Sequence, residues 1–285
     1  MKIMVTGATG KLGSLVVEAL LKSVSAENLA VSVRDPQKAE GLRSLGVDVR
    51  YGDFNHPESL VSAFAGIDRL LIISTDAVGQ RAQQHILAIK AAQEAKVGFI
   101  AYTSVVNARE SAFFIAEEHR QTEEAIINSG IPYSILRNNW YLENELATVQ
   151  AVINGAPWVT SAGEGKVGWA GRQDYAEAAA SVLAGEGHNN TVYELSGKPL
   201  TQEEFTSIVA EVIGREVQVS QVDDETYGKI MGGAGVPEQM IPFLVAIQSG
   251  IREGFLDIES DDLPNLLGRP TTPLSDALRQ MLNTN

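Results

Sequence analysis

The sequence predicts an α/β fold, a doubly wound parallel sheet followed by a smaller C-terminal lobe. Two observations carry this prediction. In the first half of the chain, short apolar runs typical of buried strands alternate with longer amphipathic runs typical of helices. The first apolar run meets three closely spaced glycines just before the first helical run. Such alternation indicates βαβ units, whose parallel strands carry helices on both faces.

The expected elements follow one another in regular order up to residue 137. Strands are predicted at residues 2–6, 29–34, 47–50, 69–74, 99–104 and 133–137. Helices are predicted near residues 11–22, 36–45, 57–65, 79–95 and 112–129. In the last of these helices, one apolar face at helical spacing holds Ile115, His119, Thr122 and Ile126.

The pattern changes after about residue 150, where the chain becomes rich in glycine. We therefore expect two parts: a sheet domain at residues 1–150, and a smaller α/β lobe at residues 151–285. The lobe is expected to pack over the carboxyl edge of the sheet. Thr201 and Glu204 fit a capping box, so a helix is predicted to begin there. The stretch "LGRPTTPLSDALRQML" is predicted to form a turn into a terminal helix.

The composition excludes several kinds of chemistry and partner. The 285 residues include no cysteine, which removes disulfides, thiolate nucleophiles and cysteine metal sites. No His, Asp and Glu set has metal-ligand spacing, so no metal is expected. The formal net charge of -14 disfavours nucleic acid as a partner. Without a membrane-length apolar run or a signal peptide, the protein is expected to be cytoplasmic, as a monomer or a homodimer.

A glycine turn joins the first strand to the first helix. Gly7, Gly10 and Gly13 in "VTGATGKLG" are spaced G-x-x-G-x-x-G. Missing side chains let a backbone approach a pyrophosphate, and the helix N-terminus offers free N–H groups and a partial positive charge. The turn therefore predicts a dinucleotide site in a Rossmann-like sheet. The alternative is that the glycines serve only a tight turn.

The end of the second strand favours NADPH over NADH. An NAD site usually has Asp or Glu at this position, whereas Arg accommodates the 2′-phosphate of NADP. In "LAVSVRDPQK" the strand ends at Arg34, and Lys38 lies one helical turn beyond. Lys11 stands in the glycine turn itself. These cations predict an NADP site, with solvated surface charges as the alternative, and Asp35 is expected to cap the next helix.

Several segments together resemble a known family. They are "VTGATGKLG", "VRDPQKA", "GVDVRYGDFNHPESLVSAFAGIDRLLIIS", "YTSV", "VGQRAQQH", "YSILRNNWYLEN" and "GRPTTPLSDAL". With them the chain is similar, over nearly its whole length, to the NmrA-like atypical short-chain dehydrogenase/reductase family, and especially to its bacterial NAD(P)H:quinone oxidoreductase members. The glycine turn is shared by many families, whereas "RNNWYLEN" together with "VGQRAQQH" is more specific.

The resemblance implies NADPH as cofactor and a small planar quinone as substrate, and no separate flavin motif is present. Asp53 and Phe54 are then expected beside the adenine, or else in a turn before the helix at Pro57. Ser74 and Thr75 are expected beside the middle of the dinucleotide, or their hydroxyls only end a strand. The implied cofactor contacts are Gly7, Ala8, Thr9, Gly10, Lys11, Leu12, Arg34, Asp53, Phe54, Ser74, Thr75, Asn138 and Asn144.

The chain departs from the short-chain dehydrogenases that act on alcohols. Those enzymes use a Tyr-x-x-x-Lys pair, in which the lysine lowers the tyrosine pKa. None of the seven tyrosines has a lysine four residues later; Tyr133 with Arg137 comes nearest, and both fall in a predicted strand. Either the protein is an NADP(H)-binding redox sensor without turnover, or its substrate needs no dedicated acid. A quinone fits the second case, because aromaticity gained drives its reduction.

The stretch "RNNWYLEN" is predicted to form the substrate site, because open α/β sheets bind ligands at the carboxyl edge. Asn138 and Asn139 are expected to donate to the nicotinamide amide or a quinone oxygen. Trp140 and Tyr141 offer flat surface for a planar substrate. The alternative is an asparagine cap with aromatic rings packed into the lobe interface. Thr103, at the end of the fifth strand, either contacts the substrate or only terminates the strand.

Two further groups of polar residues are assigned less specific roles. His119, on the apolar helix face, is predicted to be a core residue rather than a catalyst. Gln80, Arg81, Gln84 and His85 begin the helix after the fourth strand. Gln80 is expected near the substrate mouth, and Arg81 is expected to be a solvated surface charge.

Overall fold

The computed structural model describes residues 1–283 and confirms the predicted α/β architecture. Its main sheet has seven strands, every adjacent pair parallel, in the order β3-β2-β1-β4-β5-β6-β8. The strands are β1 Ile3–Thr6, β2 Leu29–Val33, β3 Asp48–Tyr51, β4 Arg69–Ile72, β5 Phe99–Val105, β6 Tyr133–Asn138 and β8 Thr191–Leu195.

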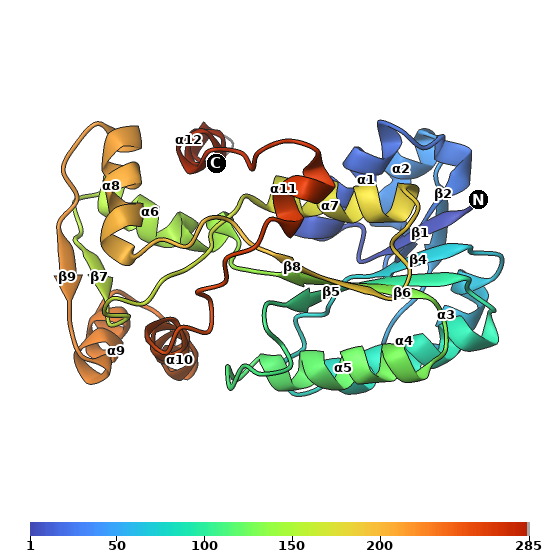
Figure 1. The fold of residues 1–285 in the computed structure, drawn as a ribbon, viewed down its shortest axis with the longest axis horizontal. Coiled ribbons are helices and arrows are strands. Elements are labelled where there is room, and N and C mark those ends of the chain that lie inside the picture. Colours follow the sequence, from blue (N-terminus) through green and yellow to red (C-terminus); the bar gives the residue numbers. More distant parts are fainter. Residues whose placement is uncertain (284–285) are drawn as a thin grey trace.

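Helices cover both faces of this sheet, with α1 and α7 on one side and α3, α4 and α5 on the other (Figure 1). Successive strand residues point to opposite faces, so Ile3 and Val5 join the core under α1, whereas Met4 joins the core over α3 and α4. The helices of this half are α1 Lys11–Leu21, α2 Glu40–Ser44, α3 Pro57–Phe64, α4 Arg81–Glu94, α5 Ala116–Asn128, α7 Arg172–Ala184 and α11 Asp262–Leu267, with the short 3-10 helices η1 Ala26–Asn28 and η2 Pro36–Ala39.

A smaller lobe lies beyond the carboxyl edge of the sheet (Figure 1). Its core stacks Trp169 on Phe205, with ring centroids 4.2 Å apart. The predicted capping box is confirmed, because Thr201 and Glu204 each accept the other's backbone N–H. The elements are η3 Leu142–Glu145, α6 Leu146–Ile153, α8 Gln202–Ile213, α9 Asp224–Gly233, η4 Glu238–Met240, α10 Ile241–Arg252, α12 Leu274–Asn283 and the parallel strands β7 Trp158–Thr160 and β9 Val219–Gln221.

The division into two domains near residue 150 remains a prediction. In the structure, the chain crosses between the two halves more than once. Helix α7 packs on α1, and β8 pairs with β6 from Ser134–Thr191 to Asn138–Leu195. The sequence pattern did not indicate this seventh strand, because most of β8 is only half-buried at the edge of the sheet. Asn138, Tyr141 and Arg172 of the candidate site lie at this crossing.

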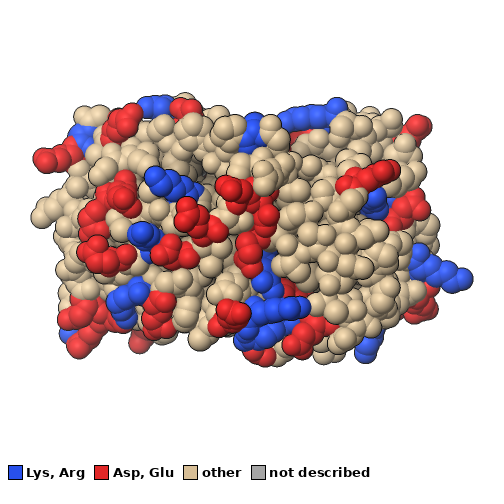
Figure 2. Space-filling model, in the orientation of Figure 1, with Lys and Arg blue, Asp and Glu red and all other residues tan. Residues whose placement is uncertain are grey.

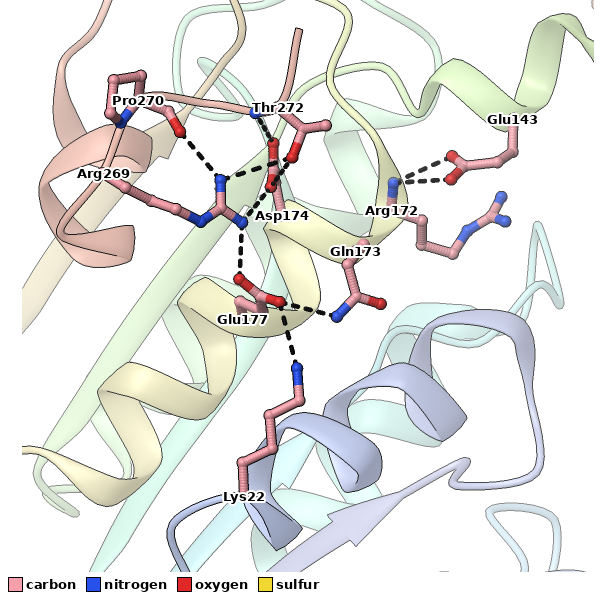
Figure 3. A network of polar contacts seen from close by, with 9 residues as sticks. All are labelled: Lys22, Glu143, Arg172, Gln173, Asp174, Glu177, Arg269, Pro270 and Thr272. Atoms are coloured by element: carbon pink, nitrogen blue, oxygen red, sulfur yellow. Dashed lines mark hydrogen bonds and ion pairs between the residues drawn. The ribbon is translucent and has the colours of Figure 1, made fainter. Parts of the chain in front are cut away.

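The C-terminal segment is fastened to α7 by a polar network (Figure 3). Asp174 is fully buried, and its carboxylate accepts from Arg269 at 2.8 Å and from the Thr272 backbone at 2.7 Å. Arg269 also pairs with Glu177, which reaches Lys22, the residue just after α1. The network holds the turn after α11, from which α12 returns to pack on α8 and η3.

Acidic side chains gather over the lobe half of the face drawn in Figure 2, with fewer basic ones among them, in keeping with the net charge of -14. Within residues 1–283, no helix is long and apolar enough to cross a membrane.

Candidate active site

The carboxyl ends of the parallel strands form one edge, and the candidate residues lie along it. Strand order reverses between β1 and β4, and a crevice opens at such a reversal in sheets of this kind. The glycine turn follows β1, and the segment after β4 lies against it. The Ile73 backbone N–H donates to Thr6 Oγ1 at 3.0 Å, and a Cβ on Gly7 would lie 3.9 Å from the Ile73 Cβ.

The three glycines of the turn have different roles. Gly7 has φ +62°, a left-handed conformation that favours glycine. A Cβ on Gly13 would lie 2.2 Å from the Gly7 carbonyl oxygen, so Gly13 allows α1 to pack directly on the turn. Gly7 and Gly10 are exposed, and no side chain caps the N-terminus of α1. The first N–H groups of this helix are therefore available to an anion.

Three cations stand in this turn or just after β2, the strand that pairs with β1. Lys11, Arg34 and Lys38 are exposed, and their side chains form no hydrogen bond or ion pair with any residue in 1–283. Asp35 is not their partner, because its carboxylate accepts from the Gln37 N–H and caps η2, as predicted. An uncapped helix N-terminus beside free cations fits a ligand with several phosphate groups, such as NADPH.

Asp53 and Phe54 lie in the turn before α3, which is the alternative that the sequence left open. The Asp53 carboxylate accepts from the Asn55 N–H at 2.9 Å, and the Asp53 N–H donates to Ser59 Oγ at 3.0 Å. The Phe54 ring meets the His85 ring edge-on at 6.1 Å. These contacts hold the segment in place beside the second strand, and its contact with adenine remains a prediction.

Thr103 joins the ends of β4 and β5. It is buried, its Oγ1 accepts from the Ser74 N–H at 2.9 Å, and its hydroxyl donates to Ser74 Oγ. The neighbouring Ser104 hydroxyl donates to buried Glu123 at 2.6 Å. Both hydroxyls are used within the protein, which favours a structural role over a substrate contact, although β5 continues past them to Val105.

Asn138 holds a buried polar atom without a partner. Its Nδ2 donates to the Tyr141 hydroxyl at 3.0 Å, but its Oδ1 is buried and has no hydrogen bond within residues 1–283. The Tyr175 hydroxyl is likewise buried and unpaired, and the rings of Tyr141 and Tyr175 meet edge-on at 5.2 Å. Leaving a buried acceptor unsatisfied costs free energy, so these two atoms are candidates for contact with a ligand.

Arg172, the first residue of α7, stands over Tyr141. Its guanidinium carbon lies 5.1 Å from the ring centroid, and the side chain forms no ion pair within the described chain (Figure 3). Burial raises the pKa of the Tyr141 hydroxyl, while the Asn138 hydrogen bond and the Arg172 charge oppose this shift. The phenol therefore stays protonated near neutral pH. Because Asn138 donates to its oxygen, the phenol's own proton is available to an acceptor. The sequence offered no signal for Arg172 or Tyr175.

The contacts of Asn139 correct its predicted role as a substrate donor. Its Nδ2 donates to Ser196 Oγ at 2.9 Å and to the Leu256 carbonyl at 3.0 Å, and its Oδ1 accepts from the Trp140 N–H. The amide is buried and fully used to tie the two halves together. Trp140 packs at the lobe interface with its Nε1 donating to Glu145, whereas Asn144 is exposed.

Three other polar residues are buried. Arg137 is 6% exposed and pairs with Glu123 and Glu194, each at 2.7 Å, so it is no substitute for a catalytic lysine. His119 is buried, as predicted. The prediction that Arg81 is solvated is wrong: only 8% of it is exposed, because the first turn of α4 directs it inward onto α5.

The fold and the bare glycine turn define a Rossmann-like protein of the dinucleotide-binding class. The model of the NmrA-like family matches residues 1–258, and the chain belongs to this family. Over 286 aligned residues it is 39% identical to quinone oxidoreductase 2 of Escherichia coli K12, with 99% of each protein covered.

Solved structures agree with this assignment. The NADPH complex of the NADPH-dependent quinone oxidoreductase QOR2 from E. coli matches with a TM-score of 0.94 at 39% identity, covering 99% of this chain and 100% of that one. Triphenylmethane reductase from Citrobacter matches with a TM-score of 0.93 at 40% identity, over 99% and 100% of the two chains.

Proposed function

We propose that the protein is an NADPH-dependent quinone oxidoreductase that transfers hydride directly from NADPH to a quinone. The observation that carries this proposal is the set of unpaired cations around a bare helix N-terminus, next to a site with no Tyr/Lys acid pair. The similarity to quinone oxidoreductase 2, over the full length of both chains, supports the substrate class.

Different residues at the carboxyl edge of the sheet are assigned to different parts of NADPH. The first N–H groups of α1, beside Gly7 and Gly10, would donate to the pyrophosphate. Arg34 would pair with the 2′-phosphate, a charge-assisted contact to which Lys11 and Lys38 would add. Asn138 would accept from the carboxamide at its Oδ1.

When bound, NADPH supplies the hydride, and the protein contributes position and hydrogen bonds. Reduction makes the quinone ring aromatic, and the hydroquinone anion is far less basic than an alkoxide. No strong acid is therefore required. Tyr141 donates its hydroxyl proton in a hydrogen bond to a quinone oxygen, and Arg172 holds the Tyr141 ring from its face. Water supplies the one further proton that converts the hydroquinone anion into the hydroquinone.

The test is the decay of NADPH absorbance with a simple benzoquinone, measured beside alcohol and aldehyde controls and with NADH in place of NADPH. We expect oxidation with the quinone, faster with NADPH than with NADH, and none with the alcohols. If NADPH binds in calorimetry but is not oxidised by any quinone, the protein is instead an NADP(H)-binding sensor.

A second candidate substrate is a cationic triarylmethane dye. Its central carbon accepts a hydride without any proton, which suits a site lacking a Tyr/Lys pair. The net charge of -14 also attracts a cation. NADPH-dependent bleaching of such a dye tests this activity, and a neutral dye of the same size is the control. The cytoplasmic location and the monomeric or homodimeric state remain predictions.

A further inference from the structure

Thr75, just beyond β4, is held by three side chains of α4. Its N–H donates to His85 Nε2 at 3.1 Å, and its carbonyl accepts from Arg81 Nε at 2.6 Å. Its hydroxyl donates to Gln84 Oε1 at 2.7 Å. All three partners are buried. Thr75 lies outside any strand or helix, so no regular backbone hydrogen bonds satisfy its N–H and carbonyl. Side chains of α4 bond both groups instead.

A second layer of contacts closes these bonds into a ring. Arg81 Nη1 donates to His119 Nε2 at 3.2 Å, and His119 Nδ1 lies 2.8 Å from the Tyr102 hydroxyl. His85 Nδ1 lies 3.4 Å from that hydroxyl and 3.1 Å from Thr122 Oγ1. Besides Thr75, the members of the ring come from β5, α4 and α5. Helices α4 and α5 are neighbours on one face of the sheet (Figure 1). Within residues 1–283, Arg81 forms no ion pair.

The donors of the ring determine the protonation of both histidines. A backbone N–H and a guanidinium can only donate, so His85 Nε2 and His119 Nε2 must accept. Each ring therefore carries its proton on Nδ1 and is neutral. Burial and the Arg81 charge lower the pKa of both residues, that of His85 to about 3. The acceptor for the Thr75 N–H is therefore present throughout the neutral range.

We propose that Arg81 and His85 are positioning residues, which hold the Ser74–Thr75 backbone against the glycine turn so that the crevice is preformed for NADPH. This inference rests on the proposed function. Its support is that this segment lies directly on the turn through Thr6 and Ile73, and that His85 and Arg81 bond both backbone groups of Thr75 from the helix side, where Gln84 bonds only its hydroxyl. A preformed crevice binds its ligand without the cost of ordering the segment.

The test compares His85→Leu with His85→Gln, because glutamine offers an amide oxygen in place of Nε2 and leucine does not. Arg81→Met removes the bond to the Thr75 carbonyl and serves as a second variant in case His85→Leu does not fold. Thr122→Val is the matched control, since it removes an outer partner of His85 and leaves every Thr75 bond intact. NADPH affinity is measured by calorimetry, and thermal stability is measured on the same samples.

We expect His85→Leu and Arg81→Met to raise the Kd for NADPH about tenfold, and His85→Gln to recover most of this loss. Thr122→Val should lower the melting temperature while leaving the Kd within about twofold. The inference is overturned if Thr122→Val weakens NADPH as much as His85→Leu does, or if neither His85→Leu nor Arg81→Met changes the Kd. NADPH binding is measured without quinone. If the wild type binds NADPH but reduces no quinone, the proposed function is refuted, and the comparison of the NADPH Kd values among the variants still tests the positioning roles of Arg81 and His85.

Discussion

Arg34 and Arg137 both stand at the carboxyl ends of parallel strands, yet the fold treats them in opposite ways. Arg34, just after β2, is exposed and has no partner within residues 1–283. Arg137, near the end of β6, is buried between Glu123 and Glu194. A buried charge needs an opposite charge or hydrogen-bond acceptors because its desolvation is costly, whereas an exposed one stays free at little cost. The exposed charge is therefore available to a ligand, and the buried pair serves the fold.

The largest expected effect comes from breaking the buried pair. Arg137→Ala leaves Glu123 buried without its cation, so the free energy of unfolding should fall by about 3–5 kcal/mol. Urea denaturation followed by circular dichroism measures this loss. The double variant Arg137→Met with Glu123→Gln should recover part of it. A loss below about 1 kcal/mol would mean that the pair behaves like an exposed one.

Arg34→Ala tests the other side of the comparison. Stability should change little, because no partner within the protein is lost. Binding of NADPH should weaken by about 2 kcal/mol, or roughly thirtyfold, and NADH binding should barely change because it lacks the 2′-phosphate. Calorimetric titration of both cofactors at fixed salt decides this. An equal loss for both would assign Arg34 to the glycine turn itself.

The pH dependence of stability tests the effect of burial on another titratable group, the buried His85. The folded-state pKa of His85 is lowered to about 3, while the unfolded chain takes up its proton near 6.5. Stability is therefore complete above about pH 6.5 and is lost as the pH falls toward 3, by about 1.4 kcal/mol per pH unit for this residue. Unfolding measured between pH 7 and 5 should show this slope, reduced in His85→Gln. An unchanged slope in that variant would remove His85 as its source.

The smallest effect is expected for Lys38→Ala. A flexible lysine acts as a point charge and cannot form the planar, two-pronged contact of an arginine. NADPH binding should weaken by about 0.5–1 kcal/mol, and raising the salt concentration should abolish the difference. The same titrations apply. A loss larger than that of Arg34→Ala would make Lys38 the main reader of the phosphate.

Much of the fold was predictable because its signals are local. Apolar runs predicted six of the seven main strands, and the glycines predicted the turn. Helix α5 begins at Ala116, four residues later than expected, because residues 112–115 precede its first hydrogen-bonded turn. The strand that was missed, β8, is an edge strand with little apolar alternation.

The predictions of single site residues divide by whether their partners are close in sequence. Asp35 and Thr201 cap helices through bonds to residues two or three positions away, and both were predicted. Asn139 and Arg81 were misread because their partners, Leu256 and His119, stand 117 and 38 residues away. A side chain's availability to a ligand depends on such distant partners.

By itself the sequence determined the parallel βαβ order, the bare glycine turn, the cations after the second strand and the lack of a Tyr/Lys pair. Each of these features follows from the types of residues and their spacing within a short stretch of sequence. Only the tertiary structure decided which polar atoms remain free. It bonded the Asn139 amide to distant partners, buried Arg81 between Thr75 and His119, and left Asn138 Oδ1 without a partner among residues 1–283. The physical reason is that a hydrogen bond depends on donor and acceptor meeting in space, and parallel strands bring together residues far apart in the chain.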